Sequence, residues 1–251
     1  MNMRKIIPAV TMVFALLSAG VQAAEIRVFS SNAVKSVLEA LAPEFEKASG
    51  HTIAFTYDTA AVLKTEIEKG AAFDVAILTA AGIDDLIKQG KIAAASRADF
   101  ARSGAGVAIK RGAAKPDIST TEAFKRALLN AKSYGFVEAG ATGIYLKNLF
   151  VKLGIADELK AKFKPIEAKV GAAPAAAAGD VEFGITQIPE ILPYAGAELL
   201  GPLPKEIQIY TDFTAGVAAN SKEANAAGAW LKFMATPSSV AVIKAKGLEP
   251  R

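Results

Sequence analysis

Cysteine is absent from the 251-residue chain, and histidine and tryptophan each occur once. Without disulfide bonds the fold must be stabilised by a buried apolar core, which the 52% content of hydrophobic residues allows. The lack of cysteine and of clustered carboxylates argues against a transition-metal site. We interpret His51, which follows Gly50, as a surface turn residue rather than as part of a Ser-His-Asp or Cys-His arrangement. We therefore expect no metal, no cofactor and no hydrolase of these types.

An excess of charge of one sign is also missing. The chain has 29 lysines and arginines against 25 aspartates and glutamates. The basic residues are scattered along the sequence, whereas a nucleic-acid-binding surface gathers them on one face. We predict no nucleic-acid partner.

The N-terminus has the pattern of a secretory signal peptide. Arg4 and Lys5 precede an apolar run over residues 6–17, which is too short for an ordinary membrane span. Val21 and Ala23 are small residues at the −3 and −1 positions of a cleavage site. We predict that residues 1–23 are a signal peptide cleaved after Ala23, and that the remainder is exported without a membrane anchor.

Helix and strand patterns alternate through the rest of the chain. The predicted strands lie at 26–29, 52–57, 73–79, 107–109, 134–137, 183–186 and 213–219. The predicted helices lie at 34–49, 61–69, 83–89, 119–130, 142–153, 172–178, 223–234 and 238–246. This order is typical of an α/β fold in which helices flank a mixed, mostly parallel sheet.

Three details of the helices can be tested against a structure. Pro43 should kink or restart the first helix, and Pro174 should break the alanine-rich segment 172–178. Ser119 and Glu122 have the spacing of a capping box, which predicts that the helix after them begins there.

A polar turn joins the first strand to the first helix. Ser30, Ser31 and Asn32 follow the mostly apolar run 26–29 and precede the helix. A helix N-terminus presents unpaired N–H groups and partial positive charge, so this turn is suited to hold an anion. Serine and asparagine are also ordinary helix caps. The turn by itself is consistent with both interpretations.

Four stretches, in this order and spacing, resemble one protein family. They are residues 28–33 (VFSSNA), 57–70 (YDTAAVLKTEIEKG), 140–145 (GATGIY) and 184–187 (GITQ). Together they make the chain similar to the type II periplasmic solute-binding proteins, in particular to the molybdate-binding branch of the ABC importers. The resemblance extends from about residue 26 to residue 250.

The resemblance implies a two-lobe fold with a ligand cleft at the hinge between the lobes. Residues 24–103 with 213–251 would form one lobe, and residues 104–212 the other. It also implies a periplasmic monomer that binds a small anion and delivers it to an ABC permease in the inner membrane.

The chain departs from the molybdate-binding pattern at positions that would contact the ligand. Ala33 and Ala60 stand where that branch usually has serines, Gln187 stands in place of a tyrosine, and Thr142 in place of an alanine. A dehydrated molybdate needs well-aimed neutral donors, so these changes favour a carboxylate ligand. The segments 201–208 and 244–250 resemble a branch that is similar to an aconitate isomerase.

Two functions therefore remain open: a binding protein for a small anion, either a carboxylate or an oxyanion, and a cis–trans isomerase of a tricarboxylate. The ligand-binding candidates are Ser30, Ser31, Asn32, Lys35, Thr59, Ala60, Thr142, Gly143, Tyr145 and Gln187. Lys35 would supply a charge and Tyr145 an aromatic lid. An isomerase needs a general base, for which Asp58, Glu190 and Lys35 are the candidates.

Overall fold

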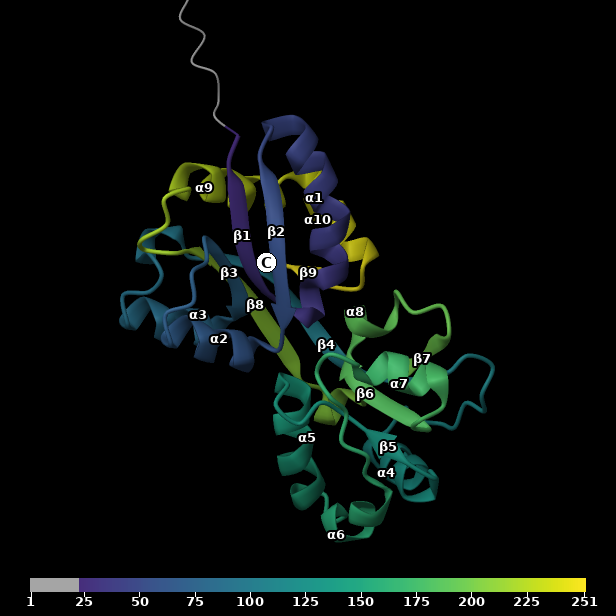
Figure 1. Cartoon of the computed structure of the whole chain (residues 1–251). Coiled ribbons are helices and arrows are strands. Elements are labelled where there is room, and N and C mark those ends of the chain that lie inside the picture. The colour runs from purple at the N-terminus through teal and green to yellow at the C-terminus, as the bar shows by residue number, and fades with distance from the viewer. Residues whose placement is uncertain (1–22) are drawn as a thin grey trace, which may run out of the picture.

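The computed structural model describes residues 23–251 as an α/β fold (Figure 1). The predicted signal peptide, apart from its last residue, lies outside this range. The strands are β1 (Glu25–Ser31), β2 (Thr52–Asp58), β3 (Val75–Thr79), β4 (Ala98–Lys110), β5 (Tyr134–Gly135), β6 (Phe183–Gln187), β7 (Ala197–Pro202), β8 (Tyr210–Val217) and β9 (Glu249–Pro250). The helices are α1 (Lys35–Ser49), α2 (Ala60–Glu68), α3 (Ala80–Lys88), α4 (Thr121–Asn130), α5 (Ala141–Lys152), α6 (Ala156–Leu159), α7 (Ala172–Ala178), α8 (Ile188–Ile191), α9 (Ala224–Met234) and α10 (Pro237–Ala245), and the short 3₁₀ helix η1 is Asn32–Val34.

The strands form a mixed sheet in the order β2-β1-β3-β8-β4-β6-β5, with β7 and β9 also paired to β4. The pairs β1–β2, β1–β3 and β5–β6 are parallel. The pairs made by β4 and β8 are antiparallel. Helices flank the sheet as predicted, but the expectation of a mostly parallel sheet is wrong. The reason is that β4 and β8 join strands distant in sequence, and the alternation of helix and strand patterns carries no information on their direction.

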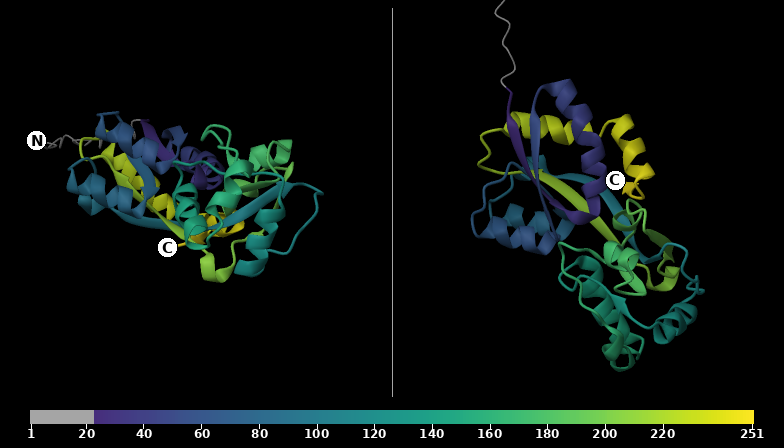
Figure 2. Two further views of the ribbon diagram at one scale, coloured as in Figure 1. Left: turned by 90° about the horizontal axis from the view of Figure 1, so that it is seen from below. Right: turned by 45° about the vertical axis from the view of Figure 1, so that its right-hand side comes forward.

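Strand β4 changes its partners in the middle of its length. Residues Ala98 to Gly104 pair with β8, whereas pairing with β6 starts at Ala105 and pairing with β7 at Gly106. Figures 1 and 2 show β4 and β8 running from the elements around β1–β3 to those around β5–β7. These two strands therefore connect the two parts of the sheet.

Each part of the sheet has its own buried side chains. One pair of apolar clusters contains residues of β1, β3 and α1–α3 together with α9, and includes Ile26, Leu38 and Trp230. The other pair contains residues of β6 and α4–α7, and includes Phe124 and Phe183. None of the helices within residues 23–251 combines the length and apolarity that crossing a bilayer requires.

Two of the local predictions about helices need correction. Helix α1 continues through Pro43, so the proline does not restart the helix; the alternative of a kink stays a prediction. Pro174 lies in the first turn of α7, where an N–H group has no partner inside the helix in any case.

The predicted capping box of Ser119 and Glu122 does not form. Thr120, and not Ser119, caps α4, and its hydroxyl accepts from the N–H of Ala123 at 3.1 Å. The N–H of Ser119 donates instead to the carboxylate of Asp117. The helix itself is formed where the sequence predicts it.

A buried carboxylate fixes β1 to its surroundings. Asp74 is 1% exposed and accepts from the guanidinium and the backbone N–H of Arg27, both at 2.9 Å, and from Ser221 at 2.8 Å. Burial alone would raise the pKa of Asp74, but these hydrogen bonds hold it below its ordinary value.

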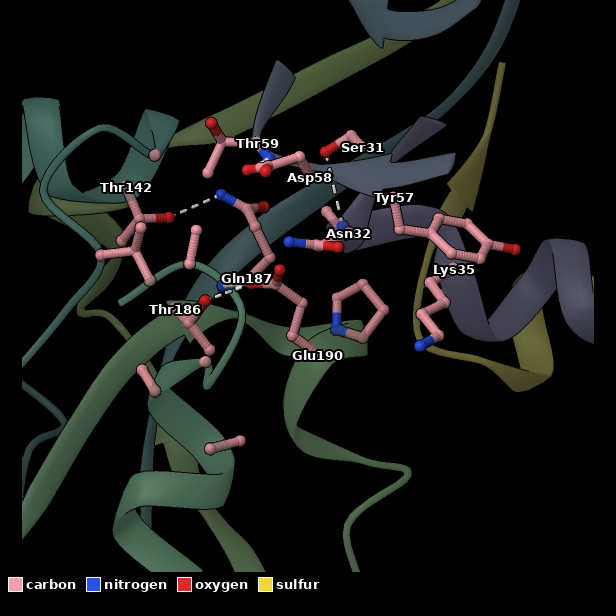
Figure 3. A pocket seen from close by; sticks show the side chains of 18 of the residues that line it. Ser31, Asn32, Lys35, Tyr57, Asp58, Thr59, Thr142, Thr186, Gln187 and Glu190 are labelled. Carbon is pink, nitrogen blue, oxygen red and sulfur yellow. Dashed lines mark hydrogen bonds between the residues drawn. The ribbon is translucent and has the colours of Figure 1, made fainter. Parts of the chain in front are cut away.

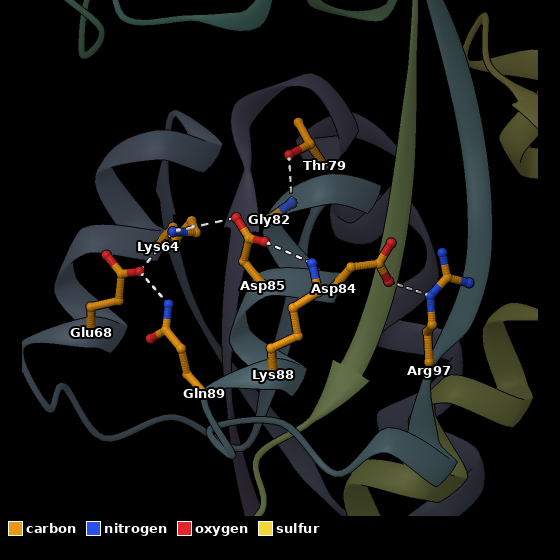
Figure 4. A network of polar contacts seen from close by, with 9 residues as sticks. All are labelled: Lys64, Glu68, Thr79, Gly82, Asp84, Asp85, Lys88, Gln89 and Arg97. Atoms are coloured by element: carbon orange, nitrogen blue, oxygen red, sulfur yellow. Dashed lines mark hydrogen bonds and ion pairs between the residues drawn. The ribbon is translucent and has the colours of Figure 1, made fainter.

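A second set of charges lies at the solvent-facing side of α2 and α3 (Figure 4). The ammonium of Lys64 contacts Glu68 at 2.6 Å and Asp85 at 3.9 Å, and Gln89 donates to Glu68 at 2.8 Å. Arg97 contacts Asp84 at 2.7 Å.

Candidate functional site

A cavity of about 550 Å³ lies where the ends of several strands meet the starts of several helices (Figure 3). Its lining comes from the ends of β1, β2 and β3, from the starts of α1, α2 and α5, from the loop before α7, and from β6 and α8. Strand ends and helix N-termini in one place are the usual position of a ligand site in α/β folds.

On one wall, hydroxyl groups cap the helices that start at the cavity. Ser31 Oγ accepts from the N–H of Ala33 at 3.4 Å, and Thr59 Oγ1 accepts from the N–H of Val62 at 3.3 Å. A hydroxyl that accepts from the backbone keeps its own hydrogen to donate. The cap interpretation and the site interpretation of the first turn are therefore compatible, because Ser31 is a cap and also lines the cavity.

On the opposite wall, α5 presents an N-terminus without a side-chain cap. Its N-cap is Gly140, and Ala141, Thr142 and Gly143 line the cavity. A Cβ at Gly143 would lie 2.2 Å from the carbonyl oxygen of Val137, so only glycine allows this close approach. The first N–H groups of α5 are thus available to an anion.

Gln187 joins this wall to strand β8. Its Nε2 donates to Thr142 Oγ1 at 2.7 Å and to Thr211 Oγ1 at 3.2 Å. The side chain is 5% exposed, and Oε1 has no hydrogen-bond partner within the described residues. A buried amide oxygen without a partner is costly, so this atom marks a place where a ligand can contribute.

Two lysines bring positive charge to the cavity. The Nζ of Lys35 lies 5.1 Å from the ring centroid of Tyr57 and 3.7 Å from Glu39. Lys169, in the loop before α7, contacts Glu167 at 2.9 Å. Both ammonium groups are on long side chains that can reach a ligand from the rim.

Two carboxyl groups lie deeper. Asp58 Oδ1 accepts from the N–H of Thr59 at 2.6 Å. Glu190 accepts from the hydroxyl of Thr186 and, at 3.3 Å, from the N–H of Gln187. Burial raises the pKa of Glu190, and these two hydrogen bonds only partly oppose that effect. Glu190 therefore holds a proton more readily than an ordinary glutamate does.

Most of the residues predicted from the sequence line this one cavity. Those brought together are Ser31, Asn32, Lys35, Asp58, Thr59, Ala60, Thr142, Gly143, Gln187 and Glu190. Whether they bind a ligand remains a prediction.

Two predicted residues are not part of the lining. Ser30 is fully buried in β1, where side chains alternate between the two faces of the sheet, and its hydroxyl donates to the carbonyl oxygen of Ser31. Tyr145 packs against the core and donates to the carbonyl oxygen of Ile207 at 2.8 Å, so it does not form the expected lid.

Sequence reasoning missed several lining residues. Tyr57 and Thr186 directly precede Asp58 and Gln187, so the ends of their strands were a usable signal. Lys169 lies in an irregular loop with no such signal. No group of three or more histidine, cysteine, aspartate or glutamate side chains suited to a metal ion occurs within residues 23–251.

Comparison with known proteins places this geometry in a family. The family model described as "bacterial extracellular solute-binding protein" matches residues 26–249. The chain belongs to this family. The resemblance inferred from the four sequence stretches is thereby confirmed.

Individual relatives of this solute-binding protein carry different names. An aconitate isomerase of a Pseudomonas species is 30% identical over 230 residues, covering 89% of this chain and 87% of the relative. The molybdate-binding protein of Azotobacter vinelandii superimposes with a TM-score of 0.75 at 21% identity, covering 89% of this chain and 98% of that one. The sulfate-binding protein SubI of Mycobacterium tuberculosis gives a TM-score of 0.69 at 15% identity, covering 90% and 87%. At these identities the two structures show a shared fold.

Proposed function

We propose that this chain is the periplasmic solute-binding protein of an ABC-type importer and that it captures a small carboxylate in a cleft between two lobes. The lobes are residues 24–103 with 213–251, and residues 104–212. The change of partners of β4 between Gly104 and Ala105 supports this boundary, with β4 and β8 as the hinge. The protein acts as a monomer and delivers its ligand to a permease in the inner membrane.

The observation that carries the proposal is the uncapped N-terminus of α5 facing the hydroxyl-capped turns of the opposite wall. Helix N-termini bind anions through N–H groups and partial positive charge. Thr142 and Gly143 supply such groups from one side, and Ser31 and Thr59 supply hydroxyls from the other. Lys35 adds a cation at the rim. Together these groups suit an anion without a metal.

The size and the chemistry of the cavity favour a carboxylate over molybdate. A volume of about 550 Å³ is in the range of sites for small organic molecules and exceeds what a single tetrahedral oxyanion fills. Ala33 and Ala60 present methyl groups at the cavity, so neither adds a hydroxyl for an oxyanion.

A thermal-shift screen tests this function. The purified protein is heated with molybdate, tungstate, sulfate, citrate, cis-aconitate or trans-aconitate. A ligand present at about one hundred times its dissociation constant adds about 2.7 kcal/mol to the free energy of unfolding. We expect at least one carboxylate to raise the melting temperature more than molybdate does. A large shift with molybdate alone would contradict the proposal.

Catalysis is a second candidate function, favoured by Glu190 and by the aconitate isomerase among the relatives. In such a reaction a base removes a proton from the methylene carbon of aconitate and returns it to the former alkene carbon. The double bond thereby shifts by one position, and no atom is gained or lost. The new double bond can form in the cis or in the trans configuration. A carboxyl group whose pKa is raised toward neutrality is suited to both transfers. Of the three candidate bases we choose Glu190, because burial raises its pKa, whereas Lys35 lies at the rim and contacts Glu39.

Proton NMR of the protein with cis-aconitate decides between the two functions. If the chain is an isomerase, trans-aconitate accumulates, and Glu190→Gln slows its formation by about 100-fold or more, the usual size of a general base contribution. Asp58→Asn serves as the comparison and should affect binding more than the rate. If the wild-type protein converts no cis-aconitate but shows a thermal shift, the isomerase function is rejected and the binding function stands.

A further inference from the structure

The cavity contains more hydrogen-bond acceptors than binding of a carboxylate requires. Asp58, at the end of β2, and Gln187, at the end of β6, point toward one another across it (Figure 3). Thr142 and Thr211 accept hydrogen bonds from Nε2 of Gln187, and Oε1 has no partner among residues 23–251. Two acceptors from opposite walls thus share one region of the cavity.

Neither the carboxylate of Asp58 nor the amide oxygen of Gln187 can donate a hydrogen bond to the other. An ionised carboxylate and an amide oxygen only accept hydrogen bonds. Asp58 Oδ1 already accepts from the N–H of Thr59. Gln187 Oε1 accepts from no described residue, although the residue is only 5% exposed. A ligand group that donates to this pair removes a penalty that the unliganded protein bears.

The geometry points to a ligand that carries a hydroxyl group in addition to its carboxylate, with the hydroxyl donating to Asp58 and Gln187 and the carboxylate at the N-terminus of α5. This inference rests on the proposed function, because it names the class of carboxylate that the same site takes. A hydroxyl fits better than an ammonium group because Lys35 and Lys169 already line the cavity with positive charge. A fully ionised oxyanion has no proton to donate to this pair.

Matched pairs of ligands test the inference by isothermal titration calorimetry. Malate and succinate differ by one hydroxyl, as do citrate and propane-1,2,3-tricarboxylate. We expect the hydroxylated member of at least one pair to bind about ten- to one-hundred-fold more tightly, since its partner leaves two acceptors unsatisfied. Aspartate is titrated beside malate to compare an ammonium with a hydroxyl at the same carbon.

The variant Asp58→Asn shows whether the pair is responsible. The asparagine keeps an oxygen for the N–H of Thr59 and gains an NH₂ group that can donate to Gln187 Oε1. The ratio of affinities between the hydroxylated ligand and its partner should therefore fall to less than about threefold. On a logarithmic scale this is half of the tenfold ratio expected for a weak hydrogen bond. Asp157→Asn is the control, because this carboxylate is 92% exposed on α6 and lies outside the cavity lining; its preference should match that of the wild type.

The possible results separate this inference from the proposed function. Equal affinities within both pairs, or tighter binding of aspartate than of malate, overturn the hydroxyl inference while carboxylate binding stands. A preference that survives Asp58→Asn also overturns it. If none of these carboxylates binds and molybdate does, the proposed function fails as well.

Discussion

A methyl group added at Gly143 has no room in the structure, and this makes Gly143→Ala a direct test of the α5 wall. The new Cβ would lie 2.2 Å from the carbonyl oxygen of Val137 and 3.0 Å from both Glu138 Cα and Phe136 Cδ2. The nearest contacts include backbone atoms, which cannot turn away as a side chain can. The start of α5 and the segment before it must separate by about 1 Å to restore a normal contact.

We expect two measurable effects of Gly143→Ala. Strain of this kind costs about 1–3 kcal/mol in the free energy of unfolding. For a chain of this size that lowers the melting temperature by about 2–12 °C. The displaced N–H groups also no longer point at the anionic ligand, so the affinity for it should fall about ten- to one-hundred-fold. This is the effect of losing one hydrogen bond to a charged group. Differential scanning calorimetry and titration with the ligand found in the thermal-shift screen measure the two.

The matched control is Gly228→Ala. A Cβ at Gly228 meets no atom within 4 Å, and the residue lies inside α9. Alanine is the better helix former by about 0.8–1.0 kcal/mol, so this variant should be slightly more stable and should bind normally. If Gly143→Ala is as stable as Gly228→Ala and retains its affinity, the description of the α5 wall is wrong.

Further variants test the charged groups. Asp74→Asn should lower the free energy of unfolding at neutral pH by about 1–3 kcal/mol, because it weakens the buried hydrogen bonds to Arg27. Folding lowers the pKa of Asp74, so the difference between variant and wild type should shrink as acid protonates the wild-type carboxylate. Urea denaturation at several pH values measures this difference. The pKa of Glu190 is raised by folding, so its ionisation destabilises the wild type as the pH rises above the pKa of glutamate in the unfolded chain. The urea midpoint of the wild type should therefore decline as the pH rises from there, and Glu190→Gln should lose this decline; an unchanged decline would refute the reasoning. Lys64→Ala should lower the free energy of unfolding by less than about 1 kcal/mol, because the ion pair of Lys64 with Glu68 is accessible to solvent. A larger loss of stability in about 0.15 M salt would show that the charges drawn in Figure 4 are not a surface network.

Much of the fold could be predicted because it follows local rules. Helix α1 ends at Gly50, whose φ of 74° is the left-handed cap that the sequence predicts. Strand β4 shows the limit of such rules. Only its residues 107–109 were predicted, whereas the strand begins at Ala98. The residues before 107 are rich in small and charged side chains, and pairing with β8 and β9 makes them a strand.

The candidate site was predictable where it coincides with strand ends. Asn32 and Thr59 follow strands β1 and β2, and Gln187 is the last residue of β6; all three strands end at one cavity. The direction of a side chain was harder to predict. Ser30 and Ser31 are neighbours in a strand, so they face opposite sides, and a shift of one residue decides which of them lines the cavity. The role of Tyr145 depends on which face of α5 is buried, and that face is set by distant residues such as Ile207.

The single tryptophan has a consequence for how the chain assembles. Trp230 is fully buried in the same cluster as Ile26 and Leu38, although it lies 204 and 192 positions after them in the chain. The long stretch in between contains the complete β5–β7 part, which can collapse before α9 exists as a docked helix. The first part cannot finish its core until the C-terminal helices return to it, and such distant contacts form slowly. Tryptophan fluorescence during refolding therefore times the last closure of the chain, while far-ultraviolet circular dichroism registers the earlier appearance of helices.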